Sequence, residues 1–230
     1  MRKKWRERLN IMNTGLYNEI CTYIESNIDL IEDNRWEEFF NFAPQGTGGI
    51  LHAAGIPFLS YLKYIPPNAF AHNDDLKSIK IPNHIIDIGH NAFFGCDGIE
   101  SIVIPNSVTS IGNTAFSDCS GLTSVIIPNS VTSIGSSAFW ACTHLTSIEI
   151  PDSVTKIETH TFRYCVNLTR VVIPDSVTTI GACAFCTGGN NIIIEYKGNK
   201  AQWKSICHDN ALMGTYYTIH CSDGDIIRKR

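Results

Sequence analysis

The sequence predicts a repeat solenoid, a stack of equivalent chain turns with a parallel β-sheet along one face. Three observations predict this fold class. A phenylalanine recurs every 23 residues from Phe70 to Phe185, a proline recurs at the same interval from Pro82 to Pro174, and a short alternating segment precedes each proline. A fixed period of this length is typical of arrays in which each turn packs against its neighbours.

The repeating unit follows one pattern. It reads approximately I-G-x-x-A-F-x-x-C-x-x-L-x-S-I-x-I-P-x-S-V-T-S, and six copies cover residues 65–197. A segment such as Thr146–Ile150 alternates and is rich in β-branched residues, which predicts a short strand with its isoleucines inward and Ser147 and Glu149 outward. The proline that follows has no N–H for a sheet ladder, so it ends the strand. We expect the equivalent strands to stack in parallel.

Four of the nine cysteines occupy the ninth position of the unit. Stacking places neighbouring Cα atoms about 4.8 Å apart, a distance that a disulfide tolerates. Side chains that stack in parallel do not face one another, however, and a buried free cysteine packs well as a small apolar residue. We therefore predict reduced thiols inside the solenoid at Cys96, Cys119, Cys142 and Cys165.

On this pattern, the unit resembles the leucine-rich repeats of the BspA type. The segments 196–206 and 217–225, which contain Y-K-G-N-K-A-Q-W-K-S-I and Y-T-I-H-C-S-D-G-D, also resemble the end segment that commonly closes such arrays. The resemblance implies a leucine-rich repeat fold and a binding function, because members of this family serve as binding surfaces for many partners. The best-known members are bacterial cell-surface adhesion proteins.

We divide the chain into three parts: a helical N-terminal cap or small accessory domain over residues 1–64, six leucine-rich repeats over 65–197, and a C-terminal cap with a basic tail over 198–230. The first part does not repeat. Thr14 and Asn34 are suited to begin two short helices within it. The ends of a solenoid expose apolar faces, so both end segments are expected to cover them.

Composition excludes several function classes. The 18 Lys and Arg residues against 22 Asp and Glu residues give a formal net charge of -4, so we expect no nucleic-acid partner. No apolar stretch reaches the ~18 residues of a membrane span, and no signal peptide is visible, which favours a cytoplasmic location. The extracellular surface is the alternative, because the family resemblance suggests it.

No catalytic set is recognisable. The sequence has no H-E-x-x-H or G-x-S-x-G motif, so we expect neither an enzyme nor a cofactor or metal site. Cys183 and Cys186 have the spacing of zinc and thiol-redox sites, and Cys207, His208 or Cys221 could add ligands. A zinc-binding or thiol-active protein is therefore an alternative, although both cysteines also occupy ordinary positions of the sixth repeat.

The remaining hypothesis is a non-catalytic protein-protein interaction module, which acts inside the cell as an inhibitor or sequestering factor for another macromolecule. A surface or secreted adhesion fragment is the second reading. Contacts must use the variable outward positions, where exposed apolar and aromatic residues often mark interfaces. Strand propensity and packing between turns explain the same residues without a partner. The candidates are Val103, Ile126, Glu149, Arg170 and Val172 on the strand face, and Phe94, Trp140 and Tyr164 at the turns.

Overall fold

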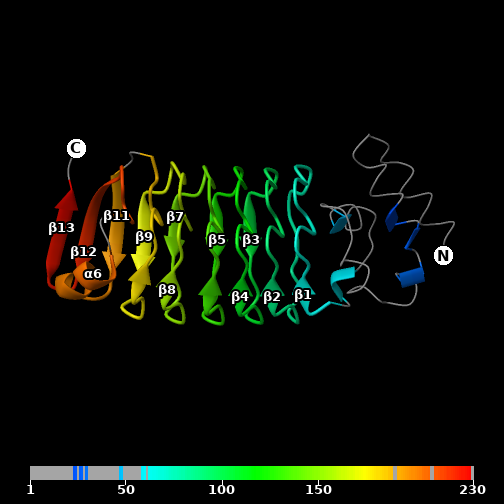
Figure 1. Cartoon of the computed structure of the whole chain (residues 1–230), viewed down its shortest axis with the longest axis horizontal. Helices are drawn as coiled ribbons and strands as arrows, with labels where there is room; N and C mark the ends of the chain where they lie inside the picture. The colour runs from blue at the N-terminus through cyan, green and yellow to red at the C-terminus, as the bar shows by residue number, and fades with distance from the viewer. Residues whose placement is uncertain are drawn as a thin grey trace.

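In a computed structural model of the chain, the described residues are 23–24, 26–27, 29–30, 47–48, 58–60, 62–188, 191–207 and 210–228. They form a parallel β-solenoid whose turns stack side by side, from β1 (Tyr64–Ile65) at one end to β13 (Gly224–Arg228) at the other (Figure 1). Among these residues, no helix combines the length and the apolar character that a membrane crossing requires.

One row of parallel strands carries the alternating segments. Equivalent serines and isoleucines pair across neighbouring turns, as the sequence predicts, with Ser101 opposite Ser124. Within a strand such as 147–149 the central isoleucine is buried and the flanking residues are exposed. The strands are β3 (Ser101–Val103), β5 (Ser124–Ile126), β7 (Ser147–Glu149), β9 (Arg170–Ile173) and β11 (Asn191–Tyr196).

A second row of parallel strands, which the sequence analysis did not predict, runs along another face of the solenoid (Figure 1). Each strand has two residues, too few to show an alternating pattern. Each ends on the first isoleucine of a repeat, which points into the core. The strands are β1, β2 (Asp87–Ile88), β4 (Ser110–Ile111), β6 (Ser133–Ile134), β8 (Lys156–Ile157) and β10 (Thr179–Ile180).

The repeated phenylalanines form the centre of the core. All six rings, from Phe70 to Phe185, are fully buried. Neighbouring rings stack with centroids 5.0 to 5.5 Å apart and planes within 8° of parallel. Stacked aromatic rings add to the free energy gained by burying their area. The inward phenylalanine column is thus confirmed.

The repeated cysteines form a second buried column, as predicted. Each thiol donates a hydrogen bond to the backbone carbonyl of the phenylalanine in the preceding turn, at 2.9 Å for Cys96 to Phe70 and 3.1 Å for Cys165 to Phe139. Burial raises the pKa of Cys96 and Cys165 to about 12. The column therefore holds neutral thiols that satisfy carbonyls inside the core.

The N-terminal part is described only at a few positions. Ile24, Leu59 and Leu62 are buried in the same hydrophobic core as Ile65. A short 3-10 helix, η1 (Phe58–Ser60), precedes the first strand. The helices predicted to begin near Thr14 and Asn34 lie mostly outside the described residues, so the helical N-terminal cap stays a prediction.

The C-terminal segment continues the strand row and then reverses direction. Helix α6 (Lys200–Ile206) begins with a capping box between Asn199 and Gln202. Strand β12 (Tyr216–Cys221) is parallel to β11, and β13 is antiparallel to β12. Arg228, expected in a basic tail, instead ends β13 opposite Tyr217. Lys229 and Arg230 lie outside the described residues.

Candidate partner-binding surface

An exposed apolar pair lies on the strand face. Val103 of β3 and Ile126 of β5 are direct cross-strand partners. Their exposed fractions are 69% and 68%, the largest of any big apolar side chain in the described residues. Neighbouring parallel strands are about 4.8 Å apart, so the two side chains present one continuous apolar patch to solvent. Both side chains point away from the core, as the alternation of the strands predicts.

Val172 differs from the expectation, because it is only 5% exposed. It faces outward on β9, between Glu149 of β7 and Glu195 of β11. Arg170 pairs in register with Ile193 and forms an ion pair with Glu195, with 2.8 Å between Nε and Oε1. The ion pair therefore crosses from β9 to β11 beside Val172, which is in register with Glu195. Val172 therefore does not extend the exposed apolar patch.

A groove of about 360 Å³ opens beside the apolar patch, between β5 and β7. Ile126 forms one wall, and Glu149 and Arg170 line it from the neighbouring strands. Within the described chain, β5 and β7 belong to separately hydrogen-bonded sheets, so the groove follows a seam in the strand row. Three sequence candidates thus meet at one depression, which Asn129, Asp152 and Lys197 also line.

The groove is lined by charges of both signs. Glu149 and Asp152 supply carboxylates, while Arg170 and Lys197 supply cations. Arg170 is already engaged by Glu195, whereas no ion pair joins Glu149 to another described residue. With Ile126 exposed beside it, this depression can hold an aliphatic side chain that ends in a positive charge. Asp152 and Lys197 lie outside the outward strand columns, so the repeat pattern does not single them out.

The turn candidates form a cluster and a separate residue. The rings of Trp140 and Tyr164 meet edge to face, with centroids 5.7 Å apart. Arg163 lies 4.6 Å from the centre of the Tyr164 ring and donates a hydrogen bond of 2.9 Å to its hydroxyl. Phe94 is not part of this cluster, since it packs edge to face on His72 at 5.0 Å. The turns therefore offer an aromatic cluster with one cation as a second candidate surface.

The paired cysteines of the sixth repeat pack as repeat residues do. Cys186 is buried, and its thiol lies 3.7 Å from the carbonyl oxygen of Asn210. Burial, together with a hydrogen bond and charge from Cys183, raises the pKa of Cys186 to about 12. Among the described residues, no group of three His, Cys, Asp or Glu side chains is placed to hold a metal ion. His208, a proposed further ligand, lies outside those residues.

Stacked turns, a parallel strand row and an inward phenylalanine column together define a leucine-rich repeat solenoid. The chain belongs to the BspA type of leucine-rich repeat proteins, whose family model matches residues 63–191 in six copies. No curated protein sequence matches the chain.

Three solved structures match more than half of the chain. The leucine-rich repeat protein of T. pallidum has a TM-score of 0.53 and 28% identity, over 56% of this chain and 59% of that one. The pneumococcal vaccine antigen PcpA has a TM-score of 0.50 and 18% identity, over 73% and 44%. A leucine-rich cell surface protein of Faecalibacterium prausnitzii has a TM-score of 0.39 and 26% identity, over 66% and 62%. The chain thus spans about three fifths of the T. pallidum protein.

Proposed function

We propose that the protein is a non-catalytic protein-protein interaction module that binds another protein through its strand face. One observation carries this proposal: Val103 and Ile126 stand side by side, about two thirds exposed, on strands whose other isoleucine and valine positions are buried. Adjacent exposed aliphatic side chains cost free energy in water, and a partner that covers them recovers it.

The surroundings of this pair define the chemistry of the partner. Asp152 and Glu149, which forms no ion pair with another described residue, supply carboxylates to the groove beside Ile126. A partner segment that presents an apolar side chain next to a Lys or Arg fits both features, since the apolar group covers Val103 and Ile126 while the cation reaches the carboxylates. Charge pairs at the rim of an apolar contact favour correct orientation and faster association.

We place this activity inside the cell, where binding alone would inhibit or sequester the partner. The composition supports this proposal, because nine cysteines are an odd number and four of them are core positions of the repeat rather than a disulfide framework.

Adhesion at the cell surface is the alternative, which the family resemblance suggests. Labelling intact source cells with a membrane-impermeant amine reagent separates the two, because only a surface protein becomes labelled.

A site-specific crosslinking experiment tests the proposed face. A photoreactive amino acid at position 126 is expected to crosslink a partner in source-cell lysate. The matched control carries the photoreactive amino acid at position 86. Ile86 is also an exposed isoleucine, 42% accessible, but it lies outside the row of strands that contains β3 and β5. A product seen at both positions, or only at 86, would contradict the strand face as the interface.

A further inference from the structure

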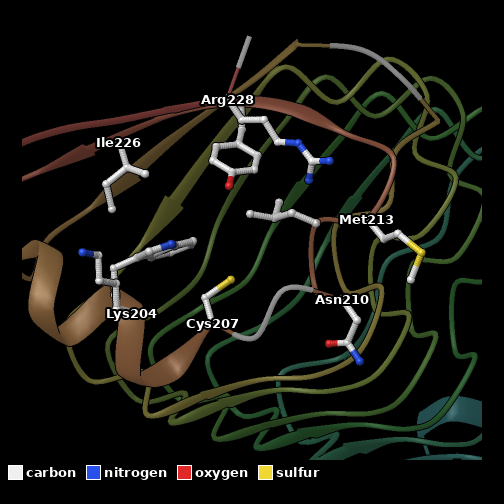
Figure 2. Close-up of a pocket in the computed structure, with 9 residues that line it drawn as sticks. Lys204, Cys207, Asn210, Met213, Ile226 and Arg228 are labelled. Atoms are coloured by element: carbon white, nitrogen blue, oxygen red, sulfur yellow. The ribbon is translucent and has the colours of Figure 1, made fainter. Parts of the chain in front are cut away.

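A pocket of about 680 Å³ lies in the C-terminal segment and shares no lining residue with the groove between β5 and β7. Helix α6 and its C-cap form one wall, residues 210–213 another, and β12 and β13 a third (Figure 2). Its volume is within the range of small-molecule sites, roughly 300 to 1,000 Å³. None of its lining residues belongs to the leucine-rich repeats.

The floor of the pocket is apolar. Trp203 and Leu212 are almost fully buried and line it together with the Tyr217 ring and Ile226. Trp203 is held in place by an edge-to-face contact with Tyr196, with ring centroids 5.3 Å apart. Such a floor favours a ligand with an apolar body, because that body gains free energy when it leaves water.

The charged side chains that line the pocket are cationic. Its charged lining residues are Lys204 and Arg228, and no carboxylate of the described residues lines it. Neither cation forms an ion pair with a described residue. Figure 2 shows the Arg228 guanidinium extending from β13 across the hollow, while the Cys207 sulfur points toward its middle. In a chain of net charge -4, this local excess of positive charge selects an anionic group.

We infer that this pocket binds a carboxylic acid with an apolar body. The apolar body lies on Trp203 and Tyr217, and the carboxylate meets the Arg228 guanidinium, whose fork geometry matches two carboxylate oxygens. Met213, which is 57% exposed at the rim, can adjust to bodies of different shape because its thioether side chain is unbranched and flexible. Two sources share this chemistry: a free fatty acid and the C-terminal carboxylate of a peptide that ends in leucine.

Calorimetric titration of the full chain with octanoate tests the inference. We expect one octanoate to bind per chain, and each methylene removed from the acid to weaken binding about fourfold. Arg228→Gln is expected to weaken octanoate binding about tenfold, since it removes a charge-assisted contact. The matched control, Lys77→Gln, removes an exposed cation far from the pocket and should bind as the unmodified protein does. Titration with N-acetyl-leucyl-leucine in parallel identifies the preferred source of the carboxylate.

Alkylation of cysteines gives a readout at the pocket itself. Cys207 and Cys183 are both half-buried, but only Cys207 lines the pocket. Saturating octanoate should slow the reaction of Cys207 with iodoacetamide and leave that of Cys183 unchanged, as mapped by mass spectrometry. The inference is overturned if neither carboxylate binds, if octanol binds as tightly as octanoate, or if Cys207 reacts at the same rate with and without ligand.

Discussion

Arg170 and Glu195 form a two-point ion pair between β9 and β11, with Nε and Nη2 donating to the two carboxylate oxygens at 2.8 and 3.0 Å. This pair lies beside Val172, which is buried, whereas Val103 and Ile126 are about two thirds exposed. The strand face is therefore open and apolar at Val103 and Ile126, whereas β9 and β11 carry this ion pair beside a buried Val172 and a partly exposed Ile193.

A double-mutant cycle of Arg170→Ala and Glu195→Ala should give a coupling free energy of about 0.2 to 1 kcal/mol. Both side chains are about half exposed, so water and salt screen their attraction. The measurement is urea unfolding of the four proteins at low and high salt. A coupling that is several times larger, or that does not fall with salt, would mean that the pair is shielded from solvent.

The stacked ring column predicts a large loss of stability for Phe139→Ala. Phe139 is fully buried between Phe116 and Phe162, and the cavity left behind should lower the free energy of unfolding by about 3 to 5 kcal/mol. Phe94→Ala is the control, because that half-buried turn residue should cost clearly less. A loss below about 1 kcal/mol at Phe139 in denaturant unfolding would contradict its place in the column.

The cysteine column predicts a loss of stability in alkali. Burial raises the pKa of Cys96 and Cys165 from 9.0 to about 12, so the folded state keeps protons that the unfolded state releases. Their contribution is fully present below pH 9 and is lost as the pH rises toward about 12. A Cys96→Ser, Cys165→Ser variant keeps a hydrogen-bond donor without this titration. Its free energy of unfolding should fall less between pH 9 and 12, and an equal fall in both proteins would contradict the assignment.

We expect the purified protein to contain no disulfide and no stoichiometric zinc. The buried thiols of the cysteine column donate to backbone carbonyls, and Cys186 lies near the carbonyl oxygen of Asn210. Intact mass and thiol titration, after purification with protected thiols, measure the number of disulfides. Metal analysis measures the zinc content. One tightly held zinc per chain would contradict the structural role of Cys183 and Cys186.

The repeat made the core predictable from the sequence. The phenylalanine and cysteine columns each occupy one position of the unit, so their burial follows from the period alone. The outward direction of Val103 and Ile126 follows from the same alternation. The two-residue strands of the second row were missed because a pair such as Ser133–Ile134 contains no alternation to detect.

Features that break the repeat could not be predicted in the same way. Val172 occupies the same repeat position as Val103 and Ile126 but is buried, and it lies beside an ion pair between Arg170 and Glu195 that has no equivalent in the earlier turns described here. The C-terminal pocket is formed by residues without repeat equivalents, from Trp203 to Arg228. Its two cations, Lys204 and Arg228, line one pocket only because α6 and β13 meet in space.

The strand-face proposal is tested most directly by the affinity of Ile126→Asp for the partner that crosslinks at position 126, measured beside its thermal midpoint. A carboxylate placed in a desolvated contact should weaken binding by at least about 2 kcal/mol. Stability should change by only about 0.5 kcal/mol, because the residue is exposed. Ile86→Asp, the matched control, should leave affinity unchanged. Unchanged binding by Ile126→Asp would contradict the proposal. If Trp140→Ala then abolishes binding, the interface lies at the turns, and if deletion of residues 1–62 abolishes it, the interface lies in the N-terminal segment.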